Sequence, residues 1–183
     1  MIKIQLLDEI YKIVAQNNLE VYDIWINKVV FTWRWWLGVA LSIVPWIFWI
    51  KVKDKNNTAR LLFVGLVTAI ISNTLDTIGS SYNLWHYDWK VLPFIPIYFP
   101  WNFTLFPVSV MLLLQFTPKM NKYIKAVAFS FMCSFVFEPF FSWISLYDAV
   151  NWEYWYSFII YIPIYLYYEY LYKSKMWQYQ NNL

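Results

Sequence analysis

The sequence predicts an all-α fold, a polytopic membrane helix bundle of about five transmembrane helices preceded by an N-terminal amphipathic helix. Of the 183 residues, 61% are hydrophobic and 24% aromatic, and only 14% are charged. Long uncharged runs in such a composition are typical of one membrane-embedded domain and not of a soluble core. We therefore expect an interfacial segment over residues 1–28 and a transmembrane domain over residues 29–183.

The segments that separate the apolar runs alternate in charge. One set carries nine cations and a single acid, Asp54, whereas the other set holds most of the remaining acids. The nine cations are Lys51, Lys53, Lys55, Arg60, Lys119, Lys122, Lys125, Lys173 and Lys175. Because Lys and Arg concentrate in cytoplasmic loops, we expect a multi-pass protein of the bacterial cell membrane with its N-terminus outside and its C-terminus in the cytoplasm. This distribution of cations explains the net charge of +3 better than a nucleic-acid partner does, so we expect the lipid bilayer and no nucleic acid as a partner.

Residues 1–28 have the pattern of a helix that lies in the outer membrane interface. Leu7, Ile10 and Val14 recur at helical spacing with acidic residues opposite them. The pair Asn17–Asn18 predicts a break in this helix.

Five apolar runs are long enough to cross a hydrocarbon core of about 30 Å at about 1.5 Å per residue. These predicted spans cover residues 29–50, 61–80, 101–117, 126–147 and 155–172. Residues 81–100, between the second and third spans, are rich in proline and aromatic residues. Proline disfavours helix, and irregular backbone cannot lie bare in lipid. We therefore expect an outer surface cap or a re-entrant lid there.

Glu138 is the ionisable carboxylate of the fourth predicted span. The serines that share its face at helical spacing are Ser130, Ser134, Ser142 and Ser145. Pro139 follows Glu138 directly and removes one backbone donor. Three roles for Glu138 stay open: an acid that holds helices together, a group that binds a ligand or proton, and a catalytic acid or base.

Other polar residues of the predicted spans converge on the outer half of the bundle. Asp76 and Asn73 share one face of the second span, and Asn102 lies at the outer end of the third. Such groups are costly in lipid and should face protein or water. Arg34 either extends to the headgroups or pairs with Asp76, which has a similar depth.

The remaining ionisable and metal-binding residue types give weaker signals. His86, the only histidine, is a ligand-binding candidate in the aromatic segment, but Asp88 alone does not complete a metal site, and we expect no metal and no cofactor. Cys133 is the only cysteine and is expected to be a small core residue. Glu169 and Lys173 are spaced for a structural ion pair. The sequence contains no P-loop, G-x-S-x-G or H-E-x-x-H motif, which weakens soluble-type enzyme hypotheses.

Five sequence features, spread over residues 35–172, are informative when they are considered together. They are Asp76, Leu84–Trp85, Leu92–Pro93, Phe106–Pro107 and Glu138. In these features the chain resembles a poorly characterised family of small multi-span membrane proteins from endospore-forming Gram-positive bacteria. The resemblance implies a bacterial plasma-membrane protein and brings no activity with it.

The leading functional hypothesis is a membrane protein with an outward-facing polar pocket that binds or transports a small polar or amphipathic ligand. A first alternative is an intramembrane enzyme that acts on a lipid or isoprenoid, with Glu138 and Asp76 as general acid and base. A second alternative is a non-catalytic subunit that has a membrane protein as its partner.

Overall fold

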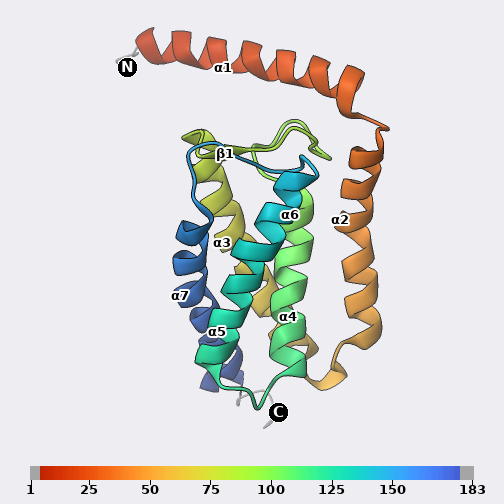
Figure 1. Cartoon of the computed structure of the whole chain (residues 1–183), viewed down its shortest axis with the longest axis vertical. Helices are drawn as coiled ribbons and strands as arrows, with labels where there is room; N and C mark the ends of the chain where they lie inside the picture. Colours follow the sequence, from red (N-terminus) through yellow and green to blue (C-terminus); the bar gives the residue numbers. More distant parts are fainter. Residues whose placement is uncertain (1–4, 178–183) are drawn as a thin grey trace.

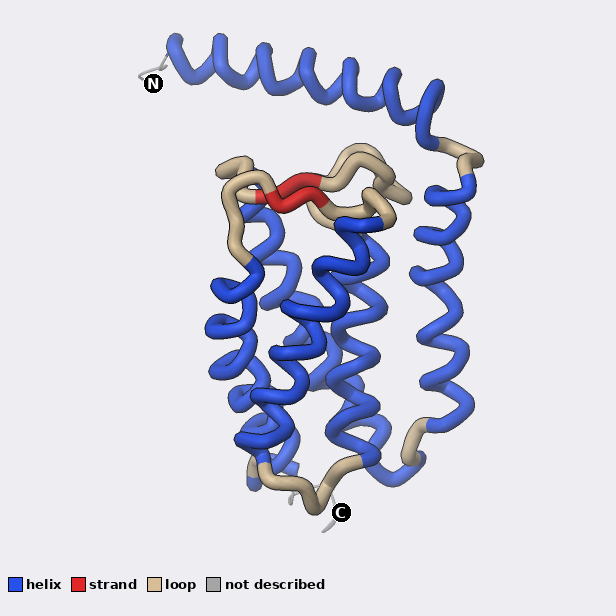
Figure 2. The backbone as a smooth tube through the Cα atoms, viewed as in Figure 1, coloured by secondary structure: helices blue, strands red, loops and turns tan. Residues whose placement is uncertain are grey.

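A computed structural model describes residues 5–177 of the chain, so residues 1–4 of the predicted interfacial segment lie outside the described residues. The helices are α1 (Gln5–Ile24), α2 (Trp33–Val52), α3 (Thr58–Ser81), α4 (Phe106–Phe116), α5 (Lys122–Phe131), α6 (Glu138–Trp143) and α7 (Tyr154–Lys173). In Figure 1, α3 to α7 form the bundle, α2 stands along its edge, and α1 lies across one end. Figure 2 shows how little of the backbone is strand. The all-α prediction is confirmed.

Short elements join these helices. Four of them are helical turns with non-α hydrogen bonding: η1 (Trp25–Val29), η2 (Lys55–Asn57), η3 (Trp101–Leu105) and η4 (Met132–Phe137). The turns η1, η3 and η4 are π-helical, and η4 joins α5 to α6 in one continuous helix. Two strands of two residues each, β1 (Trp85–His86) and β2 (Asp148–Ala149), complete the described chain.

Three helical segments are long and apolar enough to cross a membrane, fewer than the five predicted spans. They are Trp33–Val52, Lys55–Ser81 and Lys122–Trp143. The segment Trp101–Phe116 is apolar but shorter. Helix α7 has 20 residues and is long enough to cross a membrane. It contains Glu169 and many tyrosines, however, and these side chains make it less apolar than the three long segments named first.

A tight turn separates α1 from α2. The π-helical turn η1 continues α1, and Phe31 then takes a left-handed conformation with φ 62°. The Thr32 side chain accepts a hydrogen bond from the backbone N–H of Trp35 at 3.3 Å and caps α2. Helix α2 therefore begins at Trp33, a little later than the first predicted span.

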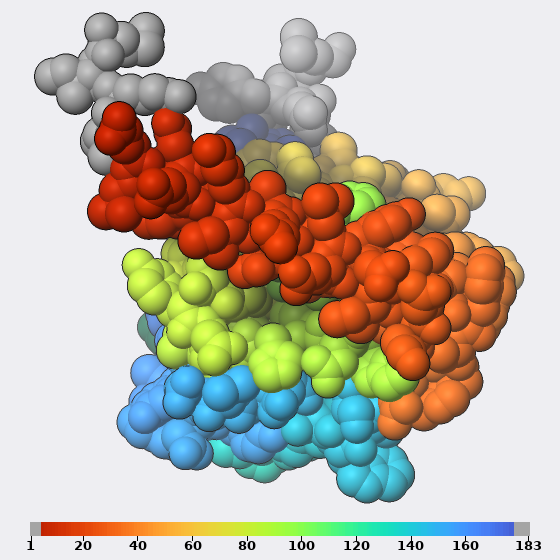
Figure 3. All heavy atoms as spheres, turned by 90° about the horizontal axis from the view of Figure 1, so that it is seen from above, coloured from red at the N-terminus to blue at the C-terminus, as the bar shows by residue number. Residues whose placement is uncertain are grey.

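Helix α1 has no buried residue. Its apolar side chains are largely solvent-accessible, with Leu7 45%, Ile10 45% and Val14 48% exposed. The helix runs without interruption through Asn17–Asn18, so the predicted break is wrong. Asparagine has only a modest cost inside a helix, and nothing else in this segment opposes helix formation. Figure 3 shows α1 crossing over the loop that follows α3.

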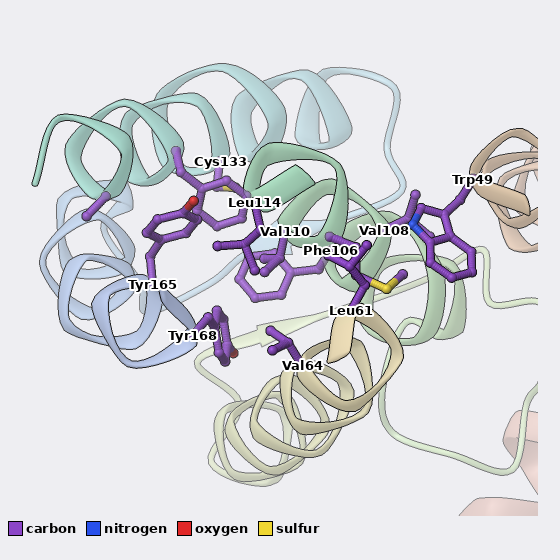
Figure 4. Packing of buried hydrophobic residues seen from close by; sticks show 13 residues of the cluster. Trp49, Leu61, Val64, Phe106, Val108, Val110, Leu114, Cys133, Tyr165 and Tyr168 are labelled. Carbon is purple, nitrogen blue, oxygen red and sulfur yellow. The ribbon is translucent and has the colours of Figure 1, made fainter. Parts of the chain in front are cut away.

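The core lies between α3, α4, α5 and α7. Val64, Val110, Leu114 and Tyr165 are fully buried there, and Figure 4 shows them converging from these helices. Gly65 permits the close contact of α3 with α4, because a Cβ atom at this position would lie 2.7 Å from the sulfur of Met111.

Two loops at the α1 end of the bundle form a joint cap, defined here as residues 82–100 and 144–153. Strands β1 and β2 pair antiparallel, with Trp85 opposite Ala149 and His86 opposite Asp148. The carbonyl of Leu84 also accepts from the backbone N–H groups of Val150 and Asn151. The second predicted span is therefore followed by an irregular segment, as expected, but its pairing with the loop after α6 is an additional feature.

A buried ion cluster ties α5 to α7 at the other end of the bundle. Lys125 and Glu169 are each 1% exposed, and the Nζ and Oε2 atoms lie 2.5 Å apart. Lys173 lies 2.7 Å from the other oxygen of Glu169 and forms the predicted pair within α7. The charge of Lys125 is therefore balanced inside the bundle.

This cluster predicts a coupled effect of two substitutions on stability. Glu169→Gln should lower the free energy of unfolding by about 3–5 kcal/mol, because it leaves the buried Lys125 without a counter-charge. Lys125→Met should lower it by less, because Lys173 still pairs with Glu169. The double variant should lose much less than the sum. Thermal unfolding in a neutral detergent measures this, with Lys122→Met, at an exposed position of the same helix, as the control. Additive losses would contradict the coupling.

Candidate functional site

A cavity of about 220 Å³ lies beneath the cap. Its walls come from α3, η3, α4, α6, α7 and both cap loops. Three of the six residues predicted from the sequence line this cavity, namely Asp76, Asn102 and Glu138. The structure thus brings together polar side chains from three separate predicted spans.

The carboxylate of Asp76 accepts four hydrogen bonds from neutral donors. The Oδ1 atom accepts from Trp85 Nε1 at 2.6 Å and from the Tyr87 hydroxyl at 2.7 Å. The Oδ2 atom accepts from the backbone N–H of Tyr98 at 3.1 Å and from the Asn102 side chain. A carboxylate has about four lone-pair positions, so these donors occupy its accepting capacity. Asp76 consequently fastens the cap and η3 to α3.

Burial keeps the hydroxyl groups of two cap tyrosines protonated, so that they can donate hydrogen bonds. Removal from water raises the pKa of Tyr87 well above its usual value, and the neighbouring Asp76 carboxylate raises it further. Burial also raises the pKa of Tyr98, whose ring stacks on that of Tyr87 with centroids 5.3 Å apart. The Tyr87 hydroxyl therefore stays protonated in its hydrogen bond to Asp76.

Gly79 lets the Trp85 indole reach Asp76 across α3. A Cβ atom at Gly79 would lie 2.1 Å from the Trp85 ring, far inside van der Waals contact. Only glycine leaves room at this point of the helix surface for the ring.

Glu138 has one satisfied oxygen and one open oxygen. The residue is 8% exposed, and its Oε1 atom accepts from the Tyr161 hydroxyl at 3.1 Å. Ser157 is a second polar neighbour of Glu138, and the Ser157 hydroxyl accepts a hydrogen bond from Trp152 Nε1 at 2.8 Å. The Oε2 atom is buried and has no hydrogen-bond partner among the described residues. This oxygen is available to a group inside the cavity.

Both π-helical turns of the bundle lie beside the cavity, and each precedes a proline. Turn η3 carries Asn102 and is followed by Pro107, and η4 ends directly before Glu138 and Pro139. Proline cannot donate to the preceding turn. The carbonyl of Phe103, which Pro107 leaves without its helical donor, accepts from Trp46 Nε1 at 3.1 Å. π-helical turns of this kind are frequent at functional sites.

Only some of the serines predicted to share the face of Glu138 in the fourth span do so. Ser130 and Ser134 are buried with Glu138, whereas Ser142 is half-buried. Ser145 is exposed and lies beyond the end of α6 with φ 62°. The prediction assumes one constant helical period along the fourth span, and η4 and the helix end at Trp143 interrupt that period.

The other three predicted residues lie outside the cavity. Arg34 donates from Nε to the carbonyl of Ile144 at 2.9 Å, and its guanidinium lies 4.7 Å from the ring centroids of Trp33 and of Trp89. The predicted Arg34–Asp76 ion pair does not form among the described residues, since Asp76 is engaged by four other donors. Arg34 instead fixes the end of α6.

Asn73 and His86 each make contacts of their own. The Asn73 amide donates to the carbonyl of Ala69 within α3 at 2.7 Å. His86 Nε2 lies 3.5 Å from Asp88 and 3.4 Å from Asp148 on the outer side of the cap. Within residues 5–177, no group of three or more His, Cys, Asp or Glu residues could hold a metal ion.

Sequence reasoning missed the cap residues that hold Asp76. Tyr87 and Tyr98 belong to a segment so rich in aromatic residues that neither of them stands out. Trp85 is part of the Leu84–Trp85 motif of the resemblance, which assigns no role to it. The signal that could have indicated one of them is Gly79, one of only three glycines in the chain and placed on the face of Asp76.

The contact of Gly79 with Trp85 predicts a specific packing defect. Gly79→Ala should lower the free energy of unfolding by about 1–3 kcal/mol, because the new methyl group displaces the indole from Asp76. Thermal unfolding in a neutral detergent measures the loss, and Thr77→Ala, an exposed position of α3, is the matched control. In a Trp85→Phe background the same Gly79→Ala change should cost much less. Equal costs in both backgrounds would show that Gly79 does not act through Trp85.

Comparison of the chain with protein-family models, with curated proteins and with solved structures finds no match. The residues of the cavity therefore carry the functional inference.

Proposed function

We propose that this chain is a multi-pass bacterial membrane protein that crosses the bilayer five times, with the cap outside and the C-terminus in the cytoplasm. Three apolar helices of sufficient length support this proposal. The shorter segment Trp101–Phe116 and helix α7 stand in the same bundle and would be carried across with them. The excess of Lys and Arg at the end opposite the cap supports the orientation.

The orientation is tested with reporter fusions. Reporters inserted after Asn56 and Met120 should report the cytoplasm, because both positions belong to cationic loops. Reporters inserted after Trp89 and Val150, both in the cap, should report the exterior. Alkaline phosphatase and green fluorescent protein fusions measure the two sides. Reversal at any one of the four positions would remove the five-span topology.

We propose that the cavity binds the polar end of a small amphipathic ligand. The observation that carries this proposal is the open Oε2 atom of Glu138, buried in a cavity whose other walls are mostly apolar. A buried acceptor without a partner costs free energy, and a ligand that donates to it recovers that cost. Mostly apolar pockets with a few convergent polar groups are typical of small-molecule sites.

The size and borders of the cavity support a ligand that enters from the bilayer. Pockets that enclose a whole drug-sized molecule usually measure about 300–1,000 Å³, and this cavity of about 220 Å³ is smaller. Its wall between α3 and α7 consists of partly exposed apolar residues, which are Ile71, Leu75, Ile78, Ile160 and Ile164. We propose that the ligand's apolar tail leaves the cavity along this seam, defined by these five residues.

The hydrogen bonds of Asp76 favour binding over catalysis by paired carboxylates. A general base needs a lone pair directed at its substrate, and four donors already occupy the Asp76 oxygens. Asp76 thus acts in this proposal as a structural anchor for the roof of the cavity.

The alternative that the chain is a subunit of a membrane complex has its own support in α1, which exposes its apolar residues along its whole described length.

Copurification tests the binding proposal. The protein purified in a neutral maltoside detergent should retain a near-stoichiometric amphiphile, detected by native mass spectrometry and identified after solvent extraction. Ile164→Trp should abolish this retention, because the larger ring closes the seam. Ile159→Trp, on the same helix but outside the cavity and 55% exposed, is the matched control and should retain the compound. Equal retention in both variants would contradict the seam, and a stoichiometric protein in place of a compound would favour the subunit alternative.

A further inference from the structure

The ionisable side chains that line the cavity indicate the chemical class of its ligand. Two carboxyl groups line it, and no Lys, Arg or His does so in the described part of the chain. All four donors to Asp76 are neutral groups. Lys90 in the cap interacts electrostatically with Asp76, but its Nζ atom donates to the carbonyl of Ile95 at 3.2 Å. An anionic headgroup would therefore meet acidic groups and no cation inside the cavity.

The cavity that Glu138 lines is also lined by aromatic rings. Trp85 and Trp152 meet edge to face with centroids 4.9 Å apart, and Trp101 and Phe141 do so at 5.7 Å. All four residues line the same cavity. The faces of aromatic rings attract cations, and Trp does so most strongly.

From these observations, and resting on the proposed function, we infer that the cavity recognises an alkylammonium group, a protonated amine that carries an apolar chain. One N–H of the ammonium donates to Glu138 Oε2, and its remaining charge lies against the aromatic rings. The same chemistry fits a free alkylamine and the amino end of a lipid, with the chain leaving along the seam. A quaternary ammonium group lacks the N–H donor and would use the rings alone.

The inference is tested with probes that share one chain and differ in their polar end. Decylammonium, decyltrimethylammonium, decanol and decanoate are titrated, each below its micelle-forming concentration, into the whole protein in a neutral maltoside detergent at pH 7. Apparent Kd values come from the dependence of Tm on probe concentration. Decylammonium should bind at least ten-fold more tightly than decanol or decanoate. The affinity of decyltrimethylammonium should lie between that of decylammonium and those of decanol and decanoate. Butylammonium tests a free headgroup, and vesicles containing phosphatidylethanolamine test the lipid source.

The variants assign the preference to one atom. Glu138→Gln should reduce the preference for decylammonium over decanol by ten-fold or more, because the amide removes the charge and one acceptor. Glu153→Gln, an exposed carboxyl outside the cavity, should keep the preference. Should Glu138→Gln fail to fold, the comparison of the four probes on the unmodified protein remains decisive.

Two further outcomes separate this inference from the proposed function. If all four decyl compounds bind equally and Ile164→Trp abolishes their binding, the cavity is an amphiphile site and the ammonium preference is wrong. If none of them produces a saturable shift in Tm, both the ammonium inference and the binding proposal are overturned.

Discussion

The carboxylate of Asp76 is the interaction on which the outer half of this structure depends. Hydrogen bonds that involve a charged group contribute about 1.5–3 kcal/mol each, more than those between neutral groups. Through four such bonds, one side chain of α3 holds the indole of Trp85, the hydroxyl of Tyr87, the backbone of Tyr98 and the amide of Asn102. The roof of the cavity, one of its walls and the start of the third predicted span are thereby fixed to α3.

The effect of Asp76 extends further through the backbone of the cap. Trp85 belongs to β1, which pairs with β2 in the loop that joins α6 to α7. The position of these two helices relative to α3 is therefore linked to the same carboxylate. Glu138 at the start of α6 and Ser157 in α7 line the cavity that results. Asp76, which the sequence offers as a candidate acid or base, thus connects the cap, η3 and α3 through its four hydrogen bonds.

The helices could be predicted from the sequence because their signals are local. Runs of apolar residues locate α3 and α7 to within a few residues of their observed bounds. The pairing of β1 with β2 could not be predicted, because two-residue strands have no periodicity and their partners are far apart in the chain. The burial of Lys125 could not be predicted either. A lysine at the end of an apolar run is expected to lie outside the span, and only the contact with Glu169 in the folded structure explains why it is buried.

The candidate site was partly predictable for a similar reason. Polar groups inside an apolar run must face protein or a cavity, and this rule correctly directs Asp76, Asn102 and Glu138 inward. Helical spacing defines a face but no partner, so it could not distinguish Asp76, which binds the cap, from Asn73, whose side-chain NH2 group donates within its own helix. Likewise, depth alone suggested a partner for Arg34, whereas the carbonyl at the end of α6 and two indole rings hold its guanidinium.

The π-helical turn η4 gives the continuous helix Lys122–Trp143 two faces in different phases. A π-helical turn contains one residue more than an α-helical turn, and one residue of an α-helix corresponds to about 100° of rotation. The part before η4 directs Lys125, Ala126 and Phe129 into the bundle, and the part after it directs Glu138 toward the cavity. Loss of a single residue from Met132–Phe137 would leave the composition and hydrophobicity of the span almost unchanged. It would nevertheless rotate Glu138 away from Tyr161, so the length of this turn matters as much as the identity of the acid that follows it.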